Sequence, residues 1–225
     1  MTIDLSIIQA ICFDVDGTLS DTDDLYVEKL VQSLRPWRFL FPKRDPTRLA
    51  RRIIMEVEAP GNFLIGLTDR IGLDDEIHAV VDHLARRTHT HSRETKIVPG
   101  VREMLDELSR RYPLAVVSAR DERTTRTFLE AFDLIPFFKC LATALTCEHT
   151  KPFPDPIIWA ARQMGVPAQA CLMVGDTTVD IRAGRKAGAQ TAGVLCGFGE
   201  RIELERNHAD MILQTTSELS GVLSA

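Results

Sequence analysis

The chain has 225 residues, of which 44% are hydrophobic and 26% are charged, and its formal net charge is −5. These proportions are typical of one globular domain, or of one domain with a smaller insert, and they exclude a disordered chain. The mild acidity provides no electrostatic footprint for nucleic acid or for an anionic membrane. No apolar run approaches the roughly 18 residues of a membrane-spanning helix, and Asp4 stands where a signal peptide carries Lys or Arg. We therefore expect a cytoplasmic protein with no nucleic-acid or membrane partner.

The cysteines indicate neither a disulfide framework nor a zinc site. Their number is odd, no two have CxxC spacing, and they do not cluster with histidine: Cys12, Cys140, Cys147, Cys171 and Cys196. Cys12 and Cys171 fall inside apolar runs, where a cysteine behaves as a small buried hydrophobic residue.

Short apolar runs rich in β-branched residues predict the strands. In chain order they are IIQAICFDV (7–15), PLAVVS (113–118), FFKCLATA (137–144), ACLMVGD (170–176), TAGVLCG (191–197) and ADMILQ (209–214). Runs that are apolar almost throughout are typical of strands buried on both faces of a parallel sheet.

Helical patterns lie between these strands. In VREMLDELSRR (101–111), Val101, Met104, Leu105 and Leu108 share one helical face. Similar patterns cover 123–134, 156–166 and 180–189. Strands that alternate with helices imply right-handed crossovers. The sequence therefore predicts an α/β fold: a Rossmann-like parallel sheet with helices on both faces.

The segment from about residue 22 to about residue 95 interrupts this alternation. It carries helical patterns and no strand signal, and it is too long for a loop. We expect an inserted all-α domain at 21–95, with residues 1–20 and 96–225 forming the α/β core. Its connections to the core are predicted near 20–24 and 92–99.

The segment FDVDGTLSD (13–21) carries the clearest chemical signal. Asp14 and Asp16 follow the first predicted strand, and Gly17 permits a tight turn. In open parallel sheets, ligands bind beyond the carboxyl ends of the strands. Two carboxylates there repel each other unless a cation lies between them, and carboxylate oxygens favour Mg²⁺. One Asp can then attack phosphorus while the other transfers a proton; the alternative is that both are turn residues.

Three further segments end at or follow predicted core strands. In GDTTVDIRAGRKAG (175–188), Asp176 can reach the same cation, and Asp180 can cap the following helix. In VVSAR (116–120), the Ser118 hydroxyl and the next backbone N–H groups can hold phosphate oxygens. In TKPFPDP (150–156), prolines fix the direction of Lys151, whose ammonium can neutralise a phosphoryl group or a nucleophilic Asp. Taken singly, each has a structural alternative: turn and cap residues for Asp176 and Asp180, a turn residue for Ser118, and a surface residue for Lys151.

Together, in this order, the four motifs resemble those of the haloacid dehalogenase superfamily of hydrolases with a helical cap. DVDGTLSDT, KPFPDP and GDTTVDIRAGRKAG are most similar to the phosphoglycolate-phosphatase-like group. The resemblance implies that Asp14 is the nucleophile that forms an aspartyl-phosphate and that Asp16 is the general acid and base. It also implies Mg²⁺ as cofactor, held by the side chains of Asp14 and Asp176 and by the backbone carbonyl of Asp16. Asp180 would ligate directly or through water.

The resemblance extends to the substrate site. Ser118 and the backbone of Ala119 would bind the phosphoryl oxygens beside Lys151, and Thr18 would steady Asp16. Ser118-Ala119-Arg120 stands where Thr-Asn is more usual, so Arg120 either contacts the leaving-group end of the substrate or faces solvent. In the insert, the basic and aromatic segment 35–52 either attracts an acidic substrate or is a solvated helix face.

The implied activity is the Mg²⁺-dependent hydrolysis of a small phosphorylated metabolite, phosphoglycolate-like or a sugar phosphate, by a monomer or homodimer. Asp16 disfavours a dehalogenase, because a halide leaving group needs no proton. A β-phosphoglucomutase-like phosphomutase shares Asp14 and Asp16 and is the main alternative, although Thr18 after the Gly favours a phosphatase. A scaffold protein without catalysis would have no need of the complete acidic set.

Overall fold

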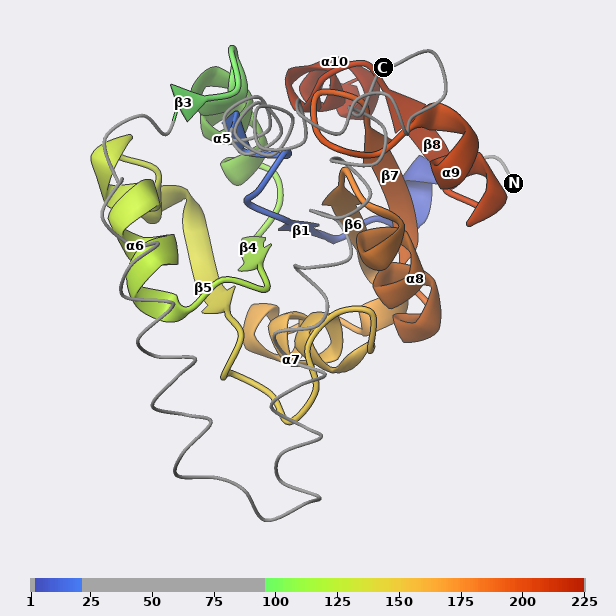
Figure 1. Cartoon of the computed structure of the whole chain (residues 1–225), viewed down its shortest axis with the longest axis horizontal. Coiled ribbons are helices and arrows are strands. Elements are labelled where there is room, and N and C mark those ends of the chain that lie inside the picture. Colours follow the sequence, from blue (N-terminus) through green and yellow to red (C-terminus); the bar gives the residue numbers. More distant parts are fainter. Residues whose placement is uncertain (1–2, 22–95, 225) are drawn as a thin grey trace, which may run out of the picture.

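The structure, a computed structural model, describes residues 3–21 and 96–224. Its main feature is a parallel sheet with the strand order β5-β4-β1-β6-β7-β8 (Figure 1). The strands are β1 (Ala10–Phe13), β4 (Leu114–Val117), β5 (Phe138–Ala142), β6 (Cys171–Gly175), β7 (Gln190–Val194) and β8 (Met211–Leu213). Five of the six lie within the predicted runs, and β7 begins one residue before its run, at Gln190. Every neighbouring pair is parallel. The predicted fold class is therefore confirmed.

The helices follow the strands in the predicted order. The α-helices of the described residues are α5 (Val101–Ser109), α6 (Glu122–Ala131), α7 (Asp155–Met164), α8 (Thr178–Ala187), α9 (Arg201–Arg206) and α10 (Leu219–Ser224). The 3₁₀ helices are η1 (Leu5–Ile7), η4 (Ile135–Phe137), η5 (Ala168–Ala170) and η6 (Thr216–Glu218). Periodicity predicted α5 to α8 but not α9 and α10, which are six residues each and too short for a clear pattern.

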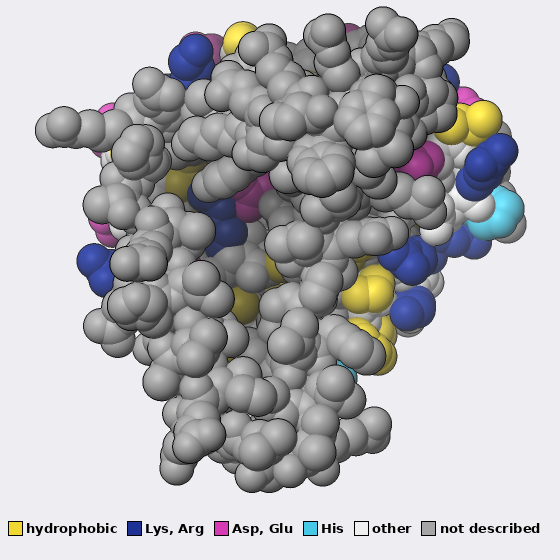
Figure 2. Space-filling view, viewed as in Figure 1, with side chains coloured by type: hydrophobic (Ala, Val, Ile, Leu, Met, Phe, Trp, Pro, Cys, Tyr) yellow, Lys and Arg dark blue, Asp and Glu magenta, His cyan; other side chains and the backbone are white. Residues whose placement is uncertain are grey.

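Two hydrophobic clusters cover the two faces of the sheet. Successive strand residues point to opposite faces, so Ile11 and Phe13 join the cluster with α5, α6 and α10. Ala10 and Cys12 join the cluster with α7 and α8. The outer sides of α8 and α9 are rich in Lys and Arg, which gather along that edge of the molecule in Figure 2. Burial of both faces explains why the strand sequences are apolar throughout.

A short ribbon marks the place where the chain leaves the core and returns to it. β2 (Ser20–Asp21) pairs with β3 (Lys96–Ile97) in antiparallel orientation. The two predicted connections of the insert therefore lie side by side, a pairing that two-residue strands do not reveal in a sequence. The insert predicted at 21–95, including the basic segment 35–52, lies outside the described residues from residue 22 onward.

The order of the strands determines where a site can form. From β1 the chain builds the sheet in one direction through β4 and β5, and in the other through β6, β7 and β8. Such a reversal opens a crevice at the carboxyl ends of the central strands. The loops after β1, β4, β5 and β6 carry the four sequence motifs and meet at this edge. Among the described helices, none is long and apolar enough to cross a membrane.

Candidate active site

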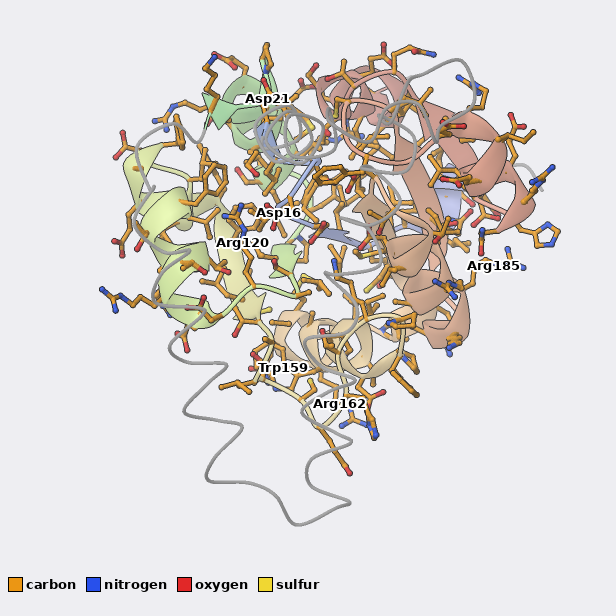
Figure 3. All side chains as sticks on the ribbon, viewed as in Figure 1. Asp16, Asp21, Arg120, Trp159, Arg162 and Arg185 are labelled. Atoms are coloured by element: carbon orange, nitrogen blue, oxygen red, sulfur yellow. The ribbon has the colours of Figure 1, made fainter. Side chains whose placement is uncertain are left out.

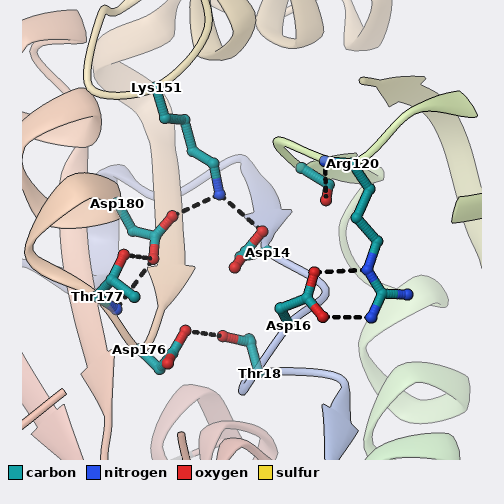
Figure 4. Close-up of polar contacts among 9 residues, drawn as sticks. Asp14, Asp16, Thr18, Arg120, Lys151, Asp176, Thr177 and Asp180 are labelled. Atoms are coloured by element: carbon teal, nitrogen blue, oxygen red, sulfur yellow. Dashed lines mark hydrogen bonds and ion pairs between the residues drawn. The ribbon is translucent and has the colours of Figure 1, made fainter. Parts of the chain in front are cut away.

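Three buried carboxylates meet at the carboxyl edge of the sheet. Asp14 follows β1, Asp176 follows β6, and Asp180 lies in the first turn of α8. One carboxylate oxygen of each lies within 4.8 Å of the others (Figure 4). Asp176 and Asp180 are fully buried, and Asp14 is 6% exposed. Hard oxygen donors at this spacing can hold a divalent cation such as Mg²⁺.

Lys151 bridges two of these carboxylates. It lies in the loop between β5 and α7, and its Nζ donates to Asp14 Oδ1 at 2.7 Å and to Asp180 Oδ1 at 2.6 Å. Its side chain is only 4% exposed. Within the described residues, the cluster therefore holds three carboxylates, and one ammonium contacts two of them. The remaining negative charge favours a bound cation.

The buried cluster changes the pKa values of its members. Burial raises the pKa of Asp14 to about 7; the ammonium of Lys151 opposes this shift, while the carboxylates of Asp180 and Asp16 add to it. Burial by itself lowers the pKa of Lys151, but its contacts with Asp14 and Asp180 outweigh burial and raise that pKa above its ordinary value. Lys151 therefore stays charged at neutral pH, whereas the charge on Asp14 depends on its neighbours.

Asp180 is held by the start of α8. The helix is capped by Thr177, and Asp180 is its third residue. Asp180 Oδ2 accepts hydrogen bonds from the Thr177 backbone N–H at 3.0 Å and from the Thr177 hydroxyl at 2.7 Å. Asp180 thus reaches back to the cap rather than being the cap residue itself, as in a capping box. Its other oxygen, Oδ1, is the one that contacts Lys151.

Thr18 contacts a different carboxylate from the one the sequence suggested. The prediction was that Thr18 would steady Asp16, but its hydroxyl donates to Asp176 Oδ1 at 3.3 Å. The turn after Asp16 carries Thr18 across to the tip of the neighbouring strand β6, and a role of Thr18 toward Asp16 stays a prediction. The carbonyl of Thr18 in turn accepts a hydrogen bond from the buried hydroxyl of Thr216 in η6, at 2.6 Å.

A slot lined by glycine holds Asp176. The Phe198 backbone N–H donates to Asp176 Oδ2 at 2.7 Å. A Cβ atom at Gly17 would lie 2.4 Å from that oxygen, and one at Gly197 would lie 2.2 Å from it. These distances leave no room for side chains. The sequence pattern does not indicate the roles of Phe198 and Thr216. The glycine-rich CGFG after β7 is the only signal near them, and by itself it does not indicate a partner.

Asp16 forms an ion pair with Arg120. Arg120 Nε donates to Asp16 Oδ2 at 2.5 Å, and Arg120 Nη2 donates to Asp16 Oδ1. The side chains are 13% (Asp16) and 20% (Arg120) exposed. Figure 3 shows the two pointing toward each other, well away from Trp159 and Arg162 of α7. The sequence left two alternatives for Arg120, a contact with the substrate or a position facing solvent. Neither of them included this pairing with Asp16.

The predicted phosphate-binding residues lie at the end of β4. Ser118 is 3% exposed, and its Oγ accepts the backbone N–H of Arg120 at 3.2 Å. That N–H is therefore already used within the loop. Ala119, the residue between them, is half-buried. The roles of Ser118 and Ala119 in binding phosphoryl oxygens stay predictions.

Comparisons with known proteins agree with the motifs. The profile of the family described as haloacid dehalogenase-like hydrolase matches residues 11–194. Pyrophosphatase PpaX from Anoxybacillus flavithermus is 29% identical over 221 residues, which cover 96% of this chain and 97% of that protein. A hydrolase from Pseudomonas syringae has the same fold, with a TM-score of 0.72 and 24% identity over 96% of this chain and 98% of its own. A "predicted phosphoglycolate phosphatase" from Haemophilus somnus gives 0.68 and 19% over 96% and 98%. The chain therefore belongs to the haloacid dehalogenase-like hydrolase family.

Proposed function

We propose that this enzyme is a Mg²⁺-dependent phosphomonoester hydrolase that works through an aspartyl-phosphate on Asp14. The observation that carries the proposal is the buried contact of Lys151 with both Asp14 and Asp180, beside Asp176, at the carboxyl edge of the sheet. A carboxylate nucleophile that attacks an anionic phosphoryl group needs positive charge close by. The cluster supplies one fixed ammonium and a set of oxygen donors that fits a cation.

Each step has a group to perform it. A carboxylate oxygen of Asp14 attacks phosphorus, and the bond from phosphorus to the leaving oxygen breaks. Asp16 gives its proton to that oxygen, so the leaving group departs as an alcohol. Asp16 then accepts a proton from water, whose oxygen attacks the aspartyl-phosphate and releases inorganic phosphate. Lys151, whose Nζ lies 2.7 Å from Asp14 Oδ1, would neutralise charge on the free carboxylate and then on the phosphoryl group as it is transferred.

The acidic cluster fits Mg²⁺ because all its donors are hard oxygens. Asp14, Asp176 and the backbone carbonyl of Asp16 would hold the ion, with Asp180 as a further ligand or a water-mediated one. When bound, Mg²⁺ supplies positive charge to the oxygens of the transferring phosphoryl group. Thr18 and the Phe198 N–H would keep the carboxylate of Asp176 aligned. Ser118, Ala119 and Lys151 would bind the phosphoryl oxygens of the substrate.

The substrate class is a small phosphorylated metabolite in the cytoplasm. The name of the Anoxybacillus relative adds pyrophosphate to the phosphoglycolate and sugar phosphates that the motifs imply. An aspartyl-phosphate must be protected from uncontrolled attack by water, a task that the predicted helical cap at 21–95 would serve by closing over the site.

The test is phosphate release with Mg²⁺ across a panel of pyrophosphate, phosphoglycolate, sugar phosphates, nucleotides and glucose 1-phosphate. We expect release of inorganic phosphate from at least one compound and a loss of at least about 10³-fold in Asp14→Asn. Asp106→Asn is the matched control, because Asp106 is exposed on α5 and forms an ion pair there with the exposed Arg110. Full activity in Asp14→Asn would exclude the assigned nucleophile. Conversion of glucose 1-phosphate to an isomer without free phosphate would instead indicate a phosphomutase.

A further inference from the structure

The ion pair between Arg120 and Asp16 adds a residue to the mechanism. We propose that Arg120 is a positioning residue that fixes the carboxylate of Asp16 for proton transfer to the leaving group. The inference rests on the proposed function, because it assigns to Asp16 the role of general acid and base. It differs from the sequence-based expectation, in which Arg120 contacts the substrate or faces solvent.

The pairing has the geometry that fixes a carboxylate most firmly. Two different nitrogens of Arg120, Nε and Nη2, donate to the two different oxygens of Asp16. Such a fork sets the plane of the carboxylate as well as its position, which a lysine ammonium does not do. Because each carboxylate oxygen has two lone-pair positions, either can still exchange a proton with a leaving group or with water.

Arg120 is itself held in place from several directions. Its backbone N–H donates to Ser118 Oγ at 3.2 Å, and its carbonyl accepts the N–H of Ala144 at 2.9 Å. Its guanidinium lies over the ring of Phe128 on α6, 5.8 Å from the ring centre. The loops after β4 and β5 therefore fix the backbone, and α6 supports the side chain. A support built this way can orient Asp16 to within the small error that proton transfer tolerates.

The position of Asp16 depends on this support because it lies on the turn after β1. Asp14, two residues earlier, has its side chain held by Lys151, which approaches from the side of the site opposite Arg120 (Figure 4). The two proposed acid and nucleophile carboxylates are thus held by two separate cations from two separate loops. Each of the two carboxylates is thus paired with its own positive charge.

The test uses substrates that differ only in their leaving group. The nitrophenolate of p-nitrophenyl phosphate leaves without needing a proton, whereas the alkoxide of an alkyl phosphate requires one. In Arg120→Gln we expect kcat for the alkyl phosphate to fall about 10- to 100-fold with less than about a 3-fold change in KM. The initial burst of nitrophenol, which reports the first chemical step, should fall less than about 3-fold. Arg120→Lys, which keeps the charge without the fork, should lie between these values.

A double-mutant cycle separates action through Asp16 from direct contact with substrate. If Arg120 acts through Asp16, adding Arg120→Gln to Asp16→Asn should change the remaining rate less than about 2-fold. This double variant removes both charges of the pair, so it remains informative if Arg120→Gln alone folds poorly. Arg123→Gln is the matched control, because Arg123 lies three residues after Arg120, in the first turn of α6, and is exposed.

Two results would overturn the inference. One is an equal loss, in Arg120→Gln, of the rate of the first chemical step with both leaving groups. The other is a further rise of KM when Arg120→Gln is combined with Asp16→Asn, which would indicate that Arg120 binds substrate directly. Neither result would touch the assignment of Asp14, because Asp14→Asn would still abolish phosphate release. The proposed function itself would be refuted by a different result, full activity in Asp14→Asn.

Discussion

Replacing Lys151 by Met, which has a similar length but no charge, isolates the electrostatic role of the buried ammonium. Lys151 Nζ lies 2.7 Å from Asp14 and 2.6 Å from Asp180, so each contact contributes roughly 6 kcal/mol of attraction at an effective dielectric constant of about 20. Most of this offsets the cost of burying the charges. Removing one partner of a buried ion pair costs about 3–5 kcal/mol of unfolding free energy, because a charge is left unpaired.

The expected loss appears as a lower Tm that depends on pH. For a chain of this length, 3–5 kcal/mol corresponds to a fall of roughly 6–20 °C. The pKa of Asp14 is raised by burial to about 7, above its value in the unfolded chain. The stability linked to a protonated Asp14 is therefore present at low pH and is lost as the pH rises through about 7. Lys151→Met raises this pKa further, so the loss should be larger at pH 8 than at pH 5.

The assay is thermal unfolding at pH 5 and pH 8, with and without Mg²⁺, beside the exposed Lys139→Met as control. Because Mg²⁺ can supply positive charge to the same carboxylates, it should raise the Tm of Lys151→Met more than that of the unmodified enzyme. A Lys151→Met protein with an unchanged Tm at pH 8 and no added metal would refute the reasoning. It would mean that the carboxylates do not depend on Lys151 for their charge balance.

Three further outcomes are expected. Gly197→Ala puts a Cβ 2.2 Å from Asp176 Oδ2, so the Mg²⁺ affinity measured by calorimetry should fall about 10- to 100-fold. Gly221→Ala is the control: its Cβ meets nothing within 4 Å, and the Mg²⁺ affinity should stay unchanged. Thr216→Val leaves the Thr18 carbonyl without the hydroxyl that donates to it; it should cost about 1–3 kcal/mol in chemical denaturation, and an unchanged midpoint would contradict this. Chelation with EDTA should abolish phosphate release and excess Mg²⁺ should restore it; activity that survives chelation would exclude a metal requirement.

The elements of the core could be predicted because their causes are local. Strands buried on both faces are apolar throughout, so β1, β4 and β6 are visible as runs such as AICF and LAVV. Helix α5 is visible because its buried residues recur at helical spacing. The shortest elements could not be predicted: two-residue strands such as β2 and β3 exist only because they pair with each other.

The candidate site also has a part that the local sequence encodes and a part that depends on the tertiary structure. The sequence by itself determined which acidic and basic residues follow core strands, because strand ends and turn residues are encoded locally. Only the tertiary structure decided which of them touch: Thr18 reaches Asp176, 158 positions away, and Arg120 reaches Asp16, 104 positions away. These pairings depend on the order of the strands in the sheet and on the course of the loops beyond them. No local pattern encodes that order, since it results from how the whole sheet buries its two faces.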